Sequence, residues 1–268
     1  MALNIPTRVC LRRSPARLFA AMLMVTALSA AAADYALIYN GPVAAEDCPE
    51  AVAAVAREAG LPVKYVSNLR KLPSLLDHAA VFIIGGTEDD LDPLIKDFSP
   101  SITQALQEYV RKGGRYLGIC GGAYMAGTGY KENGRHVSLL NLIPAEPHEF
   151  DEGNYAEQII PVRWQCVTYP MYFQAGPAFA LTPRSRGARV MAKYADGQIA
   201  ALICFYGRGR VAVIGPHPEA PPDWVEGMGQ AELWVSTRHL LVALVRELLA
   251  GGQTTAGNIA PDRPLLAR

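Results

Sequence analysis

The stretch Tyr116-Leu117-Gly118-Ile119-Cys120-Gly121-Gly122-Ala123-Tyr124 has the pattern of a buried strand that ends in a cysteine between glycines. Glycines beside a residue at a sharp strand-to-helix turn relieve steric crowding, and the side chain between them is pushed clear of its backbone. A helix that begins at Gly121 or Gly122 also directs backbone N–H groups at the sulfur, which favours a thiolate. We therefore predict that Cys120 is a nucleophile. The alternative is a core cysteine, because free cysteines are among the most often buried residues.

A second apolar strand at 211–214 runs into Gly215-Pro216-His217-Pro218-Glu219. The two prolines restrict the backbone on both sides of His217, and Glu219 supplies a carboxylate that can orient an imidazole. Taken alone, His217 is better explained as an ordinary loop histidine. Strand ends in α/β sheets gather at one edge, so the sequence predicts a triad of Cys120 as nucleophile, His217 as base and Glu219 as orienter.

Gly85 and Gly86 follow another apolar strand, which ends at Ile84. Glycines at a strand end let backbone N–H groups approach a ligand, so this loop could form an oxyanion hole together with the amide of Gly121. An ordinary turn is an equally good interpretation of the two glycines.

The first half of the chain alternates short apolar strands with helical patterns. The expected strands are 35–39, 62–66, 79–84 and 116–119, and the expected helices are 49–59 and 100–112. Continuous apolar strands between helices are typical of a parallel sheet covered on both faces. The sequence therefore predicts an α/β fold with an open, mostly parallel sheet flanked by helices, in the flavodoxin-like three-layer arrangement.

The second half predicts an antiparallel excursion from the same sheet. Strands are expected at 137–142, 158–167, 188–194, 199–206 and 210–214, with hairpin turns at 196–197 and 207–209. The glycines and arginines at 207–210 could be mistaken for a phosphate or biotin loop, but their place between two strands favours a turn. A closing helix is expected at 230–250, with Leu233 and Val235 on its buried side.

The N-terminus has the composition of a targeting signal. Residues 1–33 contain four arginines and no acidic residue, an apolar run at 18–30, and Ala31-Ala32-Ala33 before Asp34. This pattern predicts a signal peptide that is cleaved after Ala33, and hence a periplasmic or secreted protein. A membrane anchor is the alternative, but the run is shorter than the roughly 20 apolar residues of a spanning helix. Residues 34–250 are expected to form one domain, followed by a flexible tail at 251–268.

Charge and cysteine spacing limit the partners. The chain has 25 basic and 25 acidic residues, and loss of the four signal arginines leaves 21 basic residues and a net charge of −4. We therefore expect no nucleic-acid partner, and no stable membrane anchor after cleavage. No cysteines or histidines stand at metal-ligand spacing, so we expect neither a metal nor a cofactor. Export permits disulfides among Cys48, Cys166 and Cys204, and their pairing stays open.

Gly-Ile-Cys-Gly-Gly at 118–122, together with His-Pro-Glu at 217–219, resembles the class I glutamine amidotransferase superfamily. Its triad is cysteine, histidine and glutamate in this order, so the resemblance implies the same roles for Cys120, His217 and Glu219. Those glutaminases usually have a glutamine four residues after the cysteine that helps to bind glutamine. Tyr124 occupies that place here, so glutamine is not the expected substrate.

A second resemblance is to the domain found at the N-terminus of eukaryotic biotin protein ligases and in stand-alone bacterial proteins. Similar stretches lie at 39–42, 84–86, 113–124 and 217–219, and the resemblance spans 35–249. It implies an amidotransferase-like fold with no established substrate. The ligase catalytic domain has no counterpart in a chain of this length, so biotin transfer is not expected.

Together these observations predict an exported thiol enzyme of amidase or hydrolase type that acts on a small-molecule or peptide-like substrate. Tyr39, Asn40 and Tyr124 are expected to line its cleft as specificity residues. The alternative is a binding or scaffold protein that keeps the fold without turnover. A third hypothesis, that Cys120 is a redox switch, lacks a resolving cysteine nearby in the sequence. The oligomeric state is not predicted.

Overall fold

A computed structural model describes residues 35–132, 135–182, 185 and 187–250. The predicted signal peptide at 1–33 and the predicted tail at 251–268 lie outside the described residues. Among the described helices, none is long and apolar enough to cross a bilayer.

Five parallel strands form one half of the main sheet. In spatial order they are β2 (Val63–Val66), β1 (Tyr35–Tyr39), β3 (Ala79–Ile84), β4 (Arg115–Ile119) and β13 (Gly209–Ile214). Every residue of β3 is buried, as expected for a strand covered on both faces. The register pairs Ile214 of β13 with Ile119 of β4, so these two strands end side by side.

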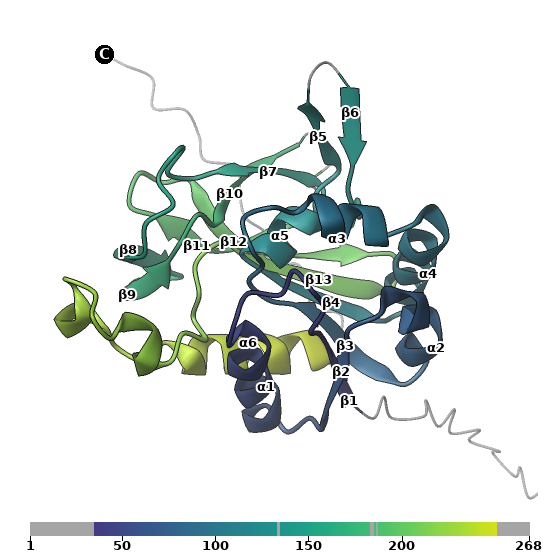
Figure 1. The fold of residues 1–268 in the computed structure, drawn as a ribbon, viewed down its shortest axis with the longest axis horizontal. Helices are drawn as coiled ribbons and strands as arrows, with labels where there is room; N and C mark the ends of the chain where they lie inside the picture. The colour runs from purple at the N-terminus through teal and green to yellow at the C-terminus, as the bar shows by residue number, and fades with distance from the viewer. Residues whose placement is uncertain (1–34, 133–134, 183–184, 186, 251–268) are drawn as a thin grey trace, which may run out of the picture. The chain divides into compact units, whose positions relative to one another are not determined.

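Helices cover both faces of this half (Figure 1). Helices α1 (Cys48–Glu58) and α6 (Arg238–Leu249) pack on one face, and α2 (Leu72–Leu76), α4 (Pro100–Arg111) and α5 (Gly121–Met125) pack on the other. Leu94 of α3 (Asp92–Asp97) is buried with the second group, and the short 3-10 helix η1 (Leu69–Lys71) precedes α2. The predicted three-layer α/β fold is confirmed.

The antiparallel part is larger than the sequence indicated. It continues the sheet from β13 through β12 (Ile199–Tyr206), β11 (Arg189–Tyr194), β8 (Gln158–Trp164) and β9 (Val167–Phe173), while β10 (Pro177–Leu181) pairs with both β12 and β7 (Ala145–Glu149). A separate hairpin joins β5 (Gly129–Glu132) and β6 (Arg135–Ser138). The predicted turns are confirmed: Gly197 and Gly207 have φ angles of 93° and 63°, which glycine adopts without strain.

Two predicted strands have the wrong bounds. The strand expected at 137–142 ends at Ser138, because the backbone N–H groups of Leu140 and Leu142 bond to the end of α5 instead of a neighbouring strand. The strand expected at 158–167 turns back at Gln165, whose φ is 53°, and the return strand β9 was not predicted. Only the last three residues of β9 are buried, so its sequence has no alternating apolar pattern that separates it from β8.

The closing helix begins at Arg238, eight residues later than predicted. The short 3-10 helices η2 (Pro222–Val225) and η3 (Ala231–Leu233) precede it, and Leu233 and Val235 are 48% and 45% exposed, so their predicted burial is wrong. Thr237 is buried at the start of α6, and its hydroxyl donates to the carbonyl of Pro218 at 3.2 Å. This bond ties the start of α6 to the loop that contains His217.

Candidate active site

Cys120 lies on a strained turn between β4 and α5. Its φ of 50° and ψ of −111° are sparsely populated for a residue with a side chain, and such strain is typical of a turn that presents a nucleophile. Cys120 is nevertheless only 9% exposed and also contacts the hydrophobic core. The glycines around it are a packing requirement. A Cβ on Gly118 would overlap the carbonyl of Gly122, and a Cβ on Gly122 would overlap the carbonyl of Ile84. The sharp turn predicted from the sequence is therefore present.

His217 and Glu219 form a buried pair after β13. Nδ1 of His217 lies 2.8 Å from Oε1 of Glu219, and the two residues are 4% and 0% exposed. In the described part of the chain, Oε2 of Glu219 has no hydrogen-bond partner. A buried carboxylate needs a compensating charge, so this arrangement favours the imidazolium form of His217.

The backbone and ring of His217 are held by residues from other elements. Its N–H donates to the carbonyl of Tyr172 on β9 at 2.9 Å. The rings of Tyr172 and Trp224 meet the imidazole edge-on, with centroids 5.6 Å and 5.5 Å away. His217 is thus fixed in position on several sides, an arrangement that would suit a general base.

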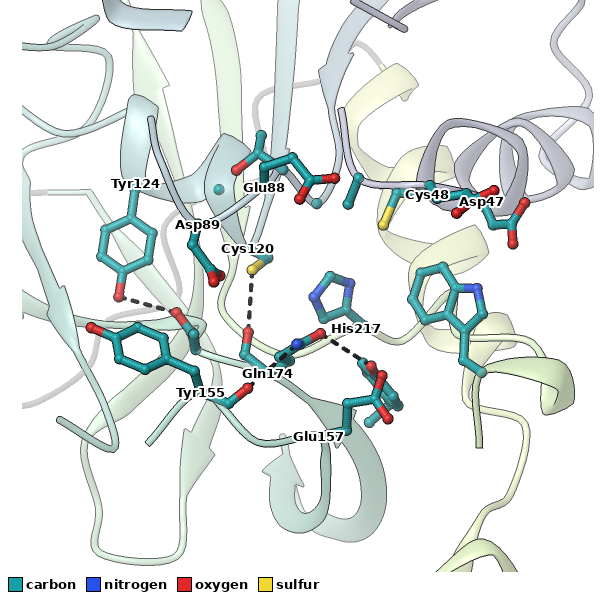
Figure 2. Close-up of a pocket in the computed structure, with 18 of the residues that line it drawn as sticks. Asp47, Cys48, Glu88, Asp89, Cys120, Tyr124, Tyr155, Glu157, Gln174 and His217 are labelled. Carbon is teal, nitrogen blue, oxygen red and sulfur yellow. Dashed lines mark hydrogen bonds between the residues drawn. The ribbon is translucent and has the colours of Figure 1, made fainter. Parts of the chain in front are cut away.

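The Cys120 sulfur lies beside the imidazole (Figure 2). Burial lowers the pKa of His217, but the charges of Glu219 and Cys120 and hydrogen bonds to both raise this pKa to about 10. By the geometry of its heavy atoms, however, the thiol donates to the carbonyl of Gln174 at 3.5 Å.

A raised pKa for His217 makes stability depend on pH. The unfolded histidine loses its proton near pH 6.5, whereas the folded one keeps it up to about pH 10. The stabilisation is complete below pH 6.5 and is lost as the pH rises towards 10. We expect the free energy of unfolding in urea to fall by roughly 3 to 4 kcal/mol more between pH 7 and pH 10 for the wild type than for His217→Gln. Parallel curves for the two proteins would contradict the charged pair.

Cys120 and His217 open into a cavity of about 600 Å³. Three more of the predicted site residues line it, namely Gly86, Gly121 and Tyr124. Gly121 begins α5, so its amide is one of the helix N–H groups without a partner in the preceding turn. The hydroxyl of Tyr124 donates to the carbonyl of Ala175 at 3.3 Å and closes one side of the cavity.

Three residues predicted for the oxyanion hole or the cleft lie outside the cavity lining. Gly85 does not line the cavity; its carbonyl accepts a bond from the Gly122 N–H at 3.1 Å and supports the turn. Tyr39 is 2% exposed and packs in the hydrophobic core on the α4 side of the sheet, and the exposed Asn40 is also absent from the cavity lining. The expectation that Tyr39 and Asn40 line the cleft is therefore wrong.

Cys48 is a cavity residue that the sequence interpretation missed. It begins α1, and its sulfur packs against Gly86, where an added Cβ would lie 2.6 Å from it. Burial, and then the charge of Glu219, raise the pKa of the Cys48 thiol, so it is protonated at neutral pH. Cys48 follows the carboxyl end of β1, and that position could have indicated its location.

Other cavity residues that the sequence interpretation missed include Tyr172 on β9, Gln174 just after it and Trp224 in η2. All four described cysteines are free thiols, so Cys120 is not joined to Cys48 although both line one cavity. A second thiol near Cys120 is therefore present in space, even though none lies nearby in the sequence.

Sequence comparisons point to one superfamily. The family model of the CobB/CobQ-like glutamine amidotransferase domain matches residues 51–151. The biotin–protein ligase of Schizosaccharomyces pombe is 26% identical over 176 residues, which make up 57% of this chain and 27% of the ligase. A cobyric acid synthase of Crocosphaera subtropica is 34% identical over 113 residues, or 40% of this chain and 21% of the synthase. The aligned parts therefore span between 21% and 27% of these two relatives.

Solved structures share the fold. A glutamine amidotransferase crystal structure has a TM-score of 0.55 at 16% identity, covering 79% of this chain and 98% of that one. A cytoplasmic protein from Salmonella typhimurium has a TM-score of 0.53 at 15% identity, covering 80% and 98%. At such identities the likeness concerns the fold alone. The partial sequence matches and the shared fold support a class I glutamine amidotransferase-like superfamily for this chain.

Proposed function

We propose that this protein is an exported, thiol-dependent hydrolase of carbon–nitrogen bonds in amides, with Cys120 as nucleophile, His217 as base and acid, and Glu219 as orienter. The observation that carries the proposal is the buried His217–Glu219 pair beside a cysteine on a strained turn. A buried ion pair is often no better for stability than apolar residues of the same volume, so its place beside a cavity favours a functional role. The mature chain in this proposal begins at Asp34.

The proposed reaction has two halves. The Cys120 sulfur, as a thiolate paired with the His217 imidazolium, adds to the amide carbonyl carbon, and the Gly121 N–H stabilises the negative charge on oxygen. His217 then gives its proton to the amide nitrogen, the C–N bond breaks, and an acyl thioester remains on Cys120. Water attacks this thioester while His217 takes one of its protons, the C–S bond breaks, and the acid leaves as the thiolate–imidazolium pair is restored. Glu219 balances the charge of His217 throughout.

Tyr124 supports a substrate other than glutamine. Its ring lines the cavity four residues after the nucleophile, and its hydroxyl is bonded to the backbone of Ala175. A phenol held in this way offers neither the carbonyl nor the amide with which a glutamine side chain forms paired hydrogen bonds.

Selective alkylation tests the activated thiol. With iodoacetamide at neutral pH, we expect Cys120 to react at least tenfold faster than Cys166, which is exposed and serves as an internal reference. Cys48 should react slowest, because burial raises its thiol pKa. Mass spectrometry of the separate peptides gives all three rates from one sample.

Substrate screening tests turnover. Amide, ester and thioester panels should show hydrolysis by the wild type that Cys120→Ala loses. If Cys120 reacts no faster than Cys166, or if the two proteins hydrolyse the panels equally, the hydrolase is excluded and the binding or scaffold role takes its place.

A further inference from the structure

The cavity above Cys120 has a lining of a single charge sign. Eight of its lining residues are carboxylates: Glu46, Asp47, Glu88, Asp89, Glu149, Glu157, Asp223 and Glu226. Of the described residues in the lining, none is a lysine or arginine. The whole chain has 25 acidic and 25 basic residues, so this lining departs from the overall composition. We call these eight residues the acidic rim.

The acidic rim is assembled from separate parts of the chain. It includes the loop before α1, the loop after β3, the end of β7, the residue before β8 and the segment around η2. Figure 2 shows four of its members, Asp47, Glu88, Asp89 and Glu157, around Cys120 and His217. All eight are exposed, and within the described chain none is ion-paired with a lysine or arginine. Their negative charge is therefore available to a ligand.

Aromatic rings complete the walls. Tyr124, Tyr155, Tyr172 and Trp224 line the same cavity. The faces of such rings attract ammonium and guanidinium groups, and Trp does so most strongly. The described residues include no group of three or more His, Cys, Asp or Glu side chains placed to hold a metal ion. Carboxylates around aromatic walls thus fit an organic cation.

We propose that the substrate is a cationic amide, which carries an alkylammonium or guanidinium group near the bond that Cys120 attacks. The inference rests on the proposed hydrolase. A cleft with carboxylates on every side raises the local concentration of cations and repels carboxylates and phosphates. Free glutamine would bring its own carboxylate into this field. The substrate class therefore extends from acylated diamines to short peptides that contain lysine or arginine.

Thiol reagents of opposite charge test the electrostatic field of the acidic rim, and this test does not require the substrate to be known. Methanethiosulfonates transfer their thioalkyl group to a cysteine sulfur and release methanesulfinate. The trimethylammonium-ethyl reagent is cationic and the sulfonato-ethyl reagent is anionic, and the two are similar in size. At low salt we expect the cation-to-anion rate ratio at Cys120 to exceed the ratio at Cys166 by about tenfold or more. The excess should fall steeply in 0.5 M NaCl, where the Debye length shortens to about 4 Å.

Matched variants assign the effect to the acidic rim. Two double variants remove charges from the acidic rim: one combines Glu88→Gln with Asp89→Asn, and the other combines Glu46→Gln with Asp47→Asn. Each should lower the cation-to-anion rate ratio at Cys120 several-fold and leave the ratio at Cys166 unchanged. Glu146→Gln is the control, because Glu146 is exposed on β7 but does not line this cavity. Equal ratios at the two cysteines would overturn the proposal, as would a high ratio at Cys120 that both double variants preserve.

The outcome is independent of turnover. The intrinsic reactivity of the Cys120 thiol affects both reagents equally and cancels in the cation-to-anion rate ratio. If Cys120 reacts slowly with iodoacetamide but shows a high ratio, the hydrolase is refuted and the cation site is retained. If neither reagent reaches Cys120, quenching of tryptophan fluorescence gives the same test through Trp224. Caesium should quench more, relative to iodide, in the wild type than in the double variants. Equal caesium-to-iodide quenching in all these proteins would overturn the proposal.

Discussion

Replacing Glu219 by glutamine should reduce hydrolysis by about 10⁴-fold, the loss seen when the acid of a related triad becomes its amide. Glu219 is fully buried, and its carboxylate contacts His217 at 2.8 Å. An amide of nearly the same volume removes the negative charge, so it can no longer stabilise an imidazolium. The turnover number on a substrate from the screen measures the effect.

A second readout separates this role from a general loss of folding. In Glu219→Gln, alkylation of Cys120 should fall to the rate of Cys166 or below, while a cooperative unfolding transition, at a lower melting temperature, shows that the protein is still folded. The same exchange at the exposed Glu146 should alter neither property. A Glu219→Gln protein that is folded and keeps more than a tenth of its activity would show that His217 needs no carboxylate.

Gly118→Ala should destabilise the protein by about 3 kcal/mol or more, at the upper end of overpacking effects. A Cβ at Gly118 would overlap the Gly122 carbonyl and crowd the Ala123 nitrogen at 2.9 Å, both of which are backbone atoms. The Gly122 carbonyl also accepts a bond from the buried Tyr116 hydroxyl at 2.7 Å, so moving it breaks a second contact. Urea unfolding measures the loss.

Gly229→Ala is the matched control for that substitution. A Cβ at Gly229 meets no atom within 4 Å, and the residue is exposed. We expect its unfolding midpoint to stay within experimental error of the wild type. If Gly118→Ala proved as stable as Gly229→Ala, the turn would tolerate a side chain, and the strict need for glycine before Cys120 would be disproved.

The parts of the site that follow directly from local chemistry could be predicted from the sequence. Cys120 lies among glycines that let two backbone segments approach each other closely. This pattern of a cysteine between glycines at a strand end is visible within a few residues of sequence. Likewise, His217 and Glu219 stand two apart after an apolar strand. The alternation of strands and helices then places both motifs at one edge of the sheet, and the structure shows this arrangement.

The walls of the cavity could not be predicted because distant segments supply them. Tyr172 and Trp224 reach His217 only after the antiparallel strands have folded back, and no spacing in the sequence records that contact. Tyr39 shows the opposite error: it ends a strand at the correct edge, but it lies on the side of the strand that faces the core. Strand alternation decides such cases only when the register is known.

The late start of α6 has a similar cause. Leucine and valine at 233 and 235 suit a helix by composition, but the backbone at Trp234 is extended, with φ of −65° and ψ of 133°. The buried hydrogen bond from the Thr237 hydroxyl to the Pro218 carbonyl instead fixes the start of the helix at Arg238. Tertiary contacts of this kind override local propensity.

The bond from the His217 N–H to the Tyr172 carbonyl has a consequence for the order of folding. Cys120 is presented by a turn of neighbouring residues, whereas His217 is anchored by a partner 45 residues away in a strand at the far side of the sheet. Contacts between distant segments generally form late, because the intervening loop must first be closed. We therefore expect the newly made chain to carry an ordinary, unreactive thiol, which becomes a strong nucleophile only when the last strands close.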